Sequence, residues 1–330
     1  MVFGDIIGNE RIKNILVKAL RRRRLPHSLL FCGPEGVGKK DMAEALAQAL
    51  VCEKKNGDAC GLCDSCRRAA RGVHPDIIKI FPENDVIVIN KMRMIKETAY
   101  FKPMLGDKRI FIITNADKMN DEAANSLLKI LEEPPLFTHV ILVTDNSFVL
   151  KPTIKSRCQI LNFSPVSRED IVRILTKKGF DEKKANIMSL MVRGNLKQAL
   201  NLDWDEVAEE KEKCWELFVA LLKRENLFLF LEEYTAGKKS EIQEEICRMM
   251  EIFSLFCRDF ILVKEGGPSA LLINPEYKDR LKEHEERWTL NQALECLDKI
   301  DYTLSGMRRH QNFRLLMSSF TAHFAEQENV

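Results

Sequence analysis

The chain has 330 residues, of which 45% are hydrophobic and 30% charged, so it is long and apolar enough for two or three domains with buried cores. Its 51 basic and 49 acidic side chains leave a net charge of +2, which excludes a polycation and confines any nucleic-acid contact to a local patch. No apolar run reaches the roughly 18 residues that cross a bilayer, and the charged start is unlike a signal peptide, so we expect a cytoplasmic protein without membrane contact.

The first half of the chain alternates short apolar runs with amphipathic stretches. Four runs, rich in aliphatic and β-branched residues, are predicted to be buried strands: Ser28–Cys32, Asp76–Ile80, Arg109–Thr114 and His139–Thr144. Helical patterns lie between them, at residues 39–50, 90–101 and 121–131. This alternation predicts an α/β domain over residues 1–163, with a parallel sheet that has helices on both faces.

The composition changes after Phe163. Three short helices are predicted up to about Leu202, and the first begins at Ser167, an N-cap residue with Asp170 three positions later. From Trp204 onwards Glu, Lys, Leu and Phe recur at helical spacing, without a strand pattern. We therefore expect a small three-helix domain at residues 164–203 and an all-helical domain at residues 204–330.

The first predicted strand leads directly into the loop Gly33-Pro34-Glu35-Gly36-Val37-Gly38-Lys39-Lys40, and a helix follows. Glycines at positions 33, 36 and 38 allow backbone N–H groups to converge on phosphate oxygens, and Lys39 lies where a loop lysine reaches the terminal phosphates. The next residue of this loop type is Ser or Thr, which binds Mg²⁺, whereas the ammonium of Lys40 cannot ligate a metal. The loop is of the nucleotide-binding type, and whether it still binds ATP or ADP is left open.

Nucleotide hydrolysis also requires acidic side chains at the end of a neighbouring strand, to hold Mg²⁺ and orient the attacking water. Here the third predicted strand continues into Thr114 and Asn115, and the first carboxylate is Asp117. We interpret Asp117 as a helix cap or a solvated turn residue. Together with Lys40, this pattern predicts that the chain does not hydrolyse ATP.

Four of the ten cysteines lie close together, separated by seven, two and two residues: Cys52, Cys60, Cys63 and Cys66. Four thiolates at this spacing can close one tetrahedral Zn²⁺ site, and they leave no position for a reactive water, so the zinc is expected to be structural. The last three also resemble the start of an iron–sulfur run, but the Cys-Pro that completes such a run is missing. The alternative of ordinary reduced cysteines does not explain four thiols within fifteen residues.

Several separated segments together resemble one family. The phosphate loop, the cysteine module at residues 52–66, the LLKILEEPP stretch at Leu127–Pro135 and the triplet Ser156-Arg157-Cys158 are similar, in this order, to bacterial clamp-loader subunits of the AAA+ superfamily. The opening Phe3–Gly8 resembles the family's N-terminal box, which lines the adenine pocket. The resemblance implies that Arg157 is an arginine finger that points into the ATP site of an adjacent subunit. It also implies that Lys197 replaces the arginine that senses the γ-phosphate.

Within this family, gamma/tau motors have a complete phosphate loop and an acidic strand end, and another subunit type keeps the finger beside a disabled site of its own. Lys40 and Thr114-Asn115 match the second type. The resemblance then implies a non-hydrolysing stator in a pentameric ring with gamma/tau and delta subunits, inside a DNA polymerase III holoenzyme. Residues 164–203 would be the lid and residues 204–330 the collar that joins the ring, which opens a sliding clamp and places it on primer-template DNA.

Two other functions fit the sequence less well. An active gamma/tau-type ATPase would release phosphate alone, which the missing metal ligands argue against. A stand-alone DNA-binding module would bind DNA with a steep salt dependence, which the near-zero net charge argues against. The basic run Arg21–Arg24 is interpreted as a solvated helix end in preference to a DNA contact.

Overall fold

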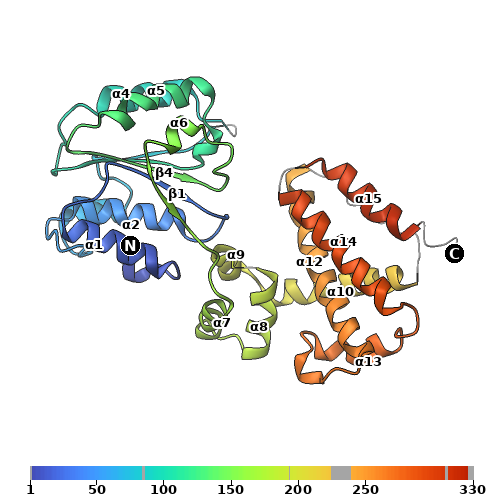
Figure 1. Ribbon diagram of the computed structural model, residues 1–330. Helices are drawn as coiled ribbons and strands as arrows, with labels where there is room; N and C mark the ends of the chain where they lie inside the picture. The colour runs from blue at the N-terminus through green and yellow to red at the C-terminus, as the bar shows by residue number, and fades with distance from the viewer. Residues whose placement is uncertain (1, 84–85, 193, 224–238, 309–310, 326–330) are drawn as a thin grey trace. The chain divides into compact units, whose positions relative to one another are not determined.

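The computed structural model describes residues 2–83, 86–192, 194–223, 239–308 and 311–325 (Figure 1). The chain divides into two compact units: residues 1–179 with 192–201, and residues 180–191 with 202–330. The boundaries of the three domains expected from composition stay a prediction.

A five-stranded sheet organises the first unit. Its strands are β1 (Ser28–Cys32), β2 (Ile77–Ile80), β3 (Arg109–Ile113), β4 (Thr138–Thr144) and β5 (Gln159–Asn162). Their order is β2-β3-β4-β1-β5 and every pairing is parallel, which confirms the predicted sheet. Strand β5 was not predicted, because this edge strand buries only Leu161 and therefore lacks a continuous apolar run.

Helices cover both faces of this sheet, as predicted (Figure 1). Side chains of successive strand residues point to opposite faces, so Leu29 and Phe31 of β1 belong to one core and Leu30 and Cys32 to the other. The first core includes α1 (Glu10–Arg21) and α2 (Lys39–Val51), and the second includes α4 (Ile89–Thr98) and α5 (Asp121–Glu132). This arrangement places the end of β1 and the start of α2 at the carboxyl edge of the sheet.

The other elements of the first unit are short. They are η1 (Phe3–Asp5), α3 (Asp64–Ala70), η2 (Ala116–Lys118), α6 (Pro152–Lys155), α7 (Arg168–Lys177) and α9 (Leu196–Asn201). The predicted cap of α7 is confirmed, because the Ser167 hydroxyl accepts a hydrogen bond from the Asp170 N–H at 3.1 Å.

Helix α4 ends at Thr98, three residues before its predicted end, because a buried ion pair captures the following segment. Arg109 Nη2 lies 3.2 Å from Asp76 Oδ1, and Arg109 Nη1 donates to the Thr98 carbonyl at 2.7 Å. The Asp76 carboxylate also accepts from the N–H groups of Met104 and Leu105, at 2.7 and 2.8 Å. Burial alone would raise the pKa of Asp76, but these two N–H donors and Arg109 outweigh it and lower the pKa.

Replacing Asp76 by Ala should lower the free energy of unfolding by about 3–5 kcal/mol, because the Arg109 guanidinium would remain buried without its partner. The stabilisation by Asp76 is present above the unfolded-state pKa of about 4 and is lost as the pH falls through the lower folded-state pKa. Urea denaturation at pH 7 measures the change. Asp107→Ala is the control, since Asp107 pairs with Lys55 on the surface and should cost at most about 1 kcal/mol. Equal losses in the two variants would contradict this account.

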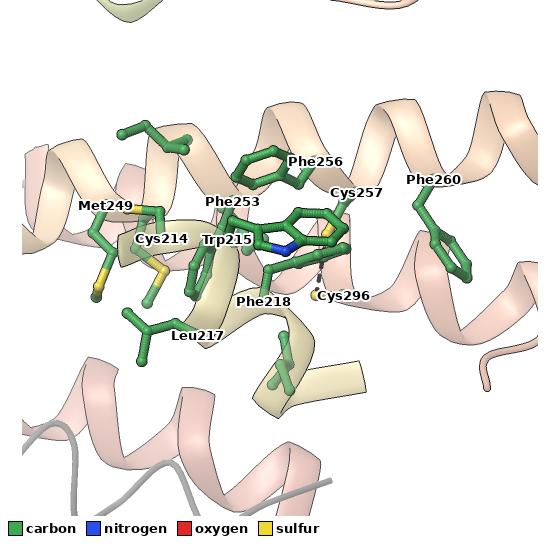
Figure 2. Close-up of a cluster of buried hydrophobic side chains, with 14 of the residues drawn as sticks. Cys214, Trp215, Leu217, Phe218, Met249, Phe253, Phe256, Cys257, Phe260 and Cys296 are labelled. Atoms are coloured by element: carbon green, nitrogen blue, oxygen red, sulfur yellow. Dashed lines mark hydrogen bonds between the residues drawn. The ribbon is translucent and has the colours of Figure 1, made fainter. Parts of the chain in front are cut away.

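Every regular element that the structure describes in the second unit is helical, which confirms the predicted all-α part. The elements are α8 (Glu182–Met191), α10 (Trp204–Leu222), α12 (Lys239–Lys264), η3 (Ser269–Leu271), η4 (Pro275–Tyr277), α13 (Lys278–Lys282), α14 (Leu290–Arg308) and α15 (Phe313–Ala325). Aromatic rings join α10 to α12: Phe256 lies 5.3 Å from Trp215 and 5.6 Å from Phe218, centroid to centroid (Figure 2). Within the described ranges, the helices are too short or too polar to cross a membrane.

Candidate functional site

The phosphate loop connects β1 to α2, and three of its glycines have backbone conformations that disfavour other residues. Gly36 and Gly38 have φ of +74° and +85°, in the left-handed region. A Cβ on Gly33 would lie 2.5 Å from the Phe163 carbonyl oxygen, and a Cβ on Gly36 would lie 1.7 Å from Asn195 Oδ1. The sequence therefore needs glycine at these positions for the loop to fit between β5 and the start of α9.

The loop lysine, Lys39, is engaged by the protein itself. Its side chain is only 4% exposed, and Nζ donates to the carbonyl oxygens of Gly33, at 2.7 Å, and of Pro34. The same Nζ lies 2.6 Å from Asp145 Oδ1. Asp145 directly follows β4, the neighbour of β1 in the sheet. The charge of Lys39 is thus already compensated within the chain.

A pocket of about 610 Å³ opens beside the loop, and Lys39, Lys40 and Lys197 all line it. Lys40 Nζ lies 5.0 Å from the centre of the Phe81 ring, a cation–π contact. The buried Thr114 hydroxyl donates to the Ile80 carbonyl at 3.1 Å, so it is committed to the sheet. The ammonium of Lys40 therefore lies at the position where nucleotide hydrolysis needs a metal-binding hydroxyl, and the Thr114 hydroxyl does not replace it.

Strand β3 is followed by Thr114 and Asn115 and not by a carboxylate, and the acidic side chain at the end of the neighbouring strand β4, Asp145, is paired with Lys39. Asp117 lies inside η2, and its carboxylate accepts a hydrogen bond from the Thr144 hydroxyl at 2.6 Å. The interpretation of Asp117 as a cap or solvated turn residue is therefore wrong, because it ties η2 to the end of β4. Asp41 is in the first turn of α2. The pKa of its carboxyl is raised, because burial and Glu44 outweigh the lowering by Lys40 and Lys197.

The start of α9 brings Lys197 to the phosphate loop. Asn195 Oδ1 accepts a hydrogen bond from the Gln198 N–H at 2.9 Å, as an N-cap does, and the Lys197 N–H donates to the Gly36 carbonyl at 3.3 Å. The Lys197 side chain is exposed and lines the same pocket as Lys39. The structure thus brings together the loop residues and Lys197 as the sequence analysis expected, while a sensing role stays a prediction.

Arg157 lies two residues after the end of α6 and is not among the residues that line this pocket. Its Nε donates to Glu132 Oε1 at 2.6 Å, and Nη2 pairs with the same oxygen. Nη1 donates to the Thr153 carbonyl at 2.9 Å and to the Ser156 hydroxyl at 3.3 Å. The Arg157 side chain is one-third exposed, so another molecule can approach it.

The four clustered cysteines converge as predicted. The Sγ atoms of Cys52, Cys60, Cys63 and Cys66 all lie within 4.8 Å of one another. The Cys60 and Cys66 sulfurs are 3.9 Å apart, close to the roughly 3.8 Å that a tetrahedral site with Zn–S bonds of about 2.3 Å requires.

Backbone N–H groups also point at these sulfurs. The N–H of Cys60 donates to Cys52 Sγ, that of Cys63 to Cys60 Sγ, and that of Cys66 to Cys63 Sγ, each at 3.4 Å. N–H donors from Cys63 and Leu62 lower the pKa of Cys60 to about 6, which favours the thiolate. Burial raises the pKa of Cys66 to about 12, so the fit of the donor set to a metal ion bound by four thiolates rests on the positions of the four sulfurs.

Three residues of these sites were not singled out from the sequence: Asp145, Glu132 and Asn195. Asp145 could have been found, because it follows a strand predicted to lie in the same sheet as β1 and the carboxyl ends of parallel strands meet. Glu132 lies in the LEEPP stretch, but sequence spacing gives no sign that it contacts Arg157.

The chain is similar in sequence to subunits of bacterial DNA polymerase III. Residues 8–167 match the family described as "DNA polymerase III, delta subunit". The chain is 30% identical to DNA polymerase III subunit delta' of Bacillus subtilis, over 87% of this chain and 88% of that protein. It is 31% identical to subunit tau of the same organism, but over only 61% of this chain and 37% of that protein. A solved gamma subunit-related protein from Thermotoga maritima is 20% identical, with a TM-score of 0.41 over 94% of this chain and 99% of that one.

Proposed function

The chain belongs to the DNA polymerase III delta' family of bacterial clamp-loader subunits, and from this premise we propose that it acts as a non-hydrolysing stator that supplies an arginine finger to a neighbour. The observation that carries the proposal is the contrast between its two cationic sites. Its own phosphate-loop pocket has Lys40 in place of a metal ligand, whereas Arg157 lies outside that pocket with its side chain one-third exposed.

The chain's own pocket lacks a hydroxyl after the loop lysine and a carboxylate directly after β3, and its Asp145 carboxylate is paired with Lys39. Catalysis of phosphoryl transfer depends on Mg²⁺ and on a side chain that orients the attacking water. Lys40 supplies an ammonium at the metal-binding position, and Thr114 is hydrogen-bonded to the sheet. The remaining functional group of the family pattern is Arg157, which has a use only beside phosphates that another subunit holds.

In the proposed complex the neighbour is a gamma/tau subunit with bound ATP, and the other neighbour is delta. Arg157 stabilises the negative charge that develops on the γ-phosphate, since a guanidinium can contact two phosphate oxygens at once. The helical second unit is the proposed collar of a pentameric ring that opens a sliding clamp and places it on primer-template DNA. Hydrolysis would then be coupled to ring geometry, and the chain would be part of a polymerase holoenzyme without ATPase activity of its own.

Cys52, Cys60, Cys63 and Cys66 are proposed to hold one structural Zn²⁺. Four thiolates complete the tetrahedral shell, so the metal has no open position for catalysis. Its proposed role is to fix the segment between α2 and α3, which has few buried apolar side chains of its own.

The isolated chain should release no phosphate from ATP, and Asp145→Asn should bind ATP several-fold more tightly than the wild type without gaining turnover. Removing the carboxylate frees the Lys39 ammonium for phosphate but supplies no metal ligand. Equilibrium binding of a fluorescent ATP analogue and a phosphate-release assay measure the two effects, with Asp117→Asn as the control outside the pocket. Turnover comparable to a motor subunit, abolished by Lys39→Ala, would overturn the proposal and favour a gamma/tau-type ATPase.

A further inference from the structure

The contacts of Arg157 leave its guanidinium poorly placed to bind a phosphate. A guanidinium has five N–H donors. Glu132 takes Nε and one hydrogen of Nη2, while the Thr153 carbonyl and the Ser156 hydroxyl lie within hydrogen-bond distance of Nη1. Glu132 therefore occupies the Nε–Nη2 edge, and on the Nη1–Nη2 edge Nη1 is also engaged within the chain.

We infer that Glu132 is a latch that sequesters Arg157 until the phosphates of a neighbouring subunit replace its carboxylate. This inference rests on the proposed function, because it assigns a regulation to the proposed arginine finger. Glu132 is the last residue of α5 and Arg157 follows α6, on the same face of the sheet (Figure 1). The two side chains are 47% and 33% exposed, so the pair is accessible to an incoming anion.

The chemistry of the exchange favours a phosphate as the displacing group. A carboxylate and a phosphate both match the planar fork of a guanidinium, so one can replace the other without a change in the backbone. The terminal phosphate of ATP carries more negative charge than a carboxylate, and a subunit interface excludes water that screens the ion pair in the free chain. The latch therefore opens only where a neighbour presents a nucleotide.

A latch reduces the apparent affinity of the complex for ATP, because only the fraction of subunits with a released finger is competent. Glu132→Gln keeps the shape of the side chain but removes its charge. In a complex reconstituted with gamma/tau and delta subunits, this variant should lower the ATP concentration for half-maximal turnover about two- to fivefold, the range for a partly exposed ion pair. The maximal rate should stay close to the wild-type value, since the finger still reaches the phosphate.

Glu133→Gln is the matched control, because it removes the same charge at the neighbouring position. The Glu133 side chain is exposed and makes no contact with Arg157 among the described residues. It should leave the half-saturating ATP concentration unchanged. In an Arg157→Ala background, Glu132→Gln should also have no effect, because the latch then holds nothing. Glu132→Ala provides a second variant with the same expected shift.

Each other result overturns a defined part of the account. An unchanged half-saturating concentration in both Glu132 variants would overturn the latch alone, provided that Arg157→Ala lowers turnover. A lower maximal rate in Glu132→Gln would also overturn it, since Glu132 would then orient the finger instead of sequestering it. If Arg157→Ala leaves turnover unchanged, the finger and the latch both fail.

Discussion

Replacing Arg157 by Ala should lower DNA-stimulated ATP turnover and clamp loading by a reconstituted complex while leaving folding and assembly intact. An essential arginine finger contributes about 10³–10⁵ in rate. The whole complex should lose less than this, because other subunits keep their own fingers. Arg157→Lys should restore only part of the activity, since an ammonium cannot contact two phosphate oxygens as a guanidinium does.

The control for this substitution is Arg173→Ala, which removes an exposed arginine of α7 that pairs with Asp170 three residues earlier on the same helix. It should leave turnover and loading unchanged. Size-exclusion chromatography and thermal unfolding check that each variant assembles and folds. Wild-type turnover and loading with the Arg157→Ala chain would show that Arg157 is an ordinary surface cation.

Purified protein should contain about one zinc per chain, and Cys66→Ser should abolish stable metal binding. Cys66 is fully buried and lies 3.9 Å from Cys60 Sγ, so its loss opens the tetrahedral shell. Structural zinc sites in small peptides contribute about 10–16 kcal/mol of apparent binding free energy, so the effect on the cysteine module should be large. Metal analysis and limited proteolysis of residues 52–66 measure these changes.

The sheet should nonetheless fold in Cys66→Ser and in Cys63→Ser, because its two cores are formed mainly by strands and helices outside the module. Cys247→Ser is the control, since Cys247 lies in the second unit and far along the chain from the cluster. It should retain the metal. Protein prepared under reducing conditions without chelators and free of zinc would contradict the assignment, and bound iron would favour the iron–sulfur alternative.

The sequence alone predicted the parts of the fold that depend on local patterns. Strands β1, β3 and β4 are nearly continuous apolar runs because both faces of the sheet are covered, and this pattern is readable without a structure. The edge strand β5 buries one side chain and was missed. The end of α4 was placed too late, because the ion pair that captures the following segment joins Asp76 to a residue far along the chain.

The candidate sites could likewise be predicted only where they depend on residues that are close together in the sequence. The phosphate loop and the cysteine cluster are contiguous in sequence, so their residue types and spacing identify them. The engagement of Lys39 by Asp145 and of Arg157 by Glu132 depends on which strands and helices are neighbours in space. The spacing of residues in the sequence identifies the functional groups of each site, whereas only the fold shows which of these groups are paired with other side chains of the chain.

The most direct test of the account is a structure of the reconstituted complex with a non-hydrolysable ATP analogue bound. The account predicts that the Arg157 guanidinium lies about 3 Å from oxygens of the γ-phosphate held by a gamma/tau neighbour, with its contact to Glu132 broken. An assembled complex with ATP analogue in the neighbouring site and Arg157 still paired with Glu132, away from every phosphate, would contradict it.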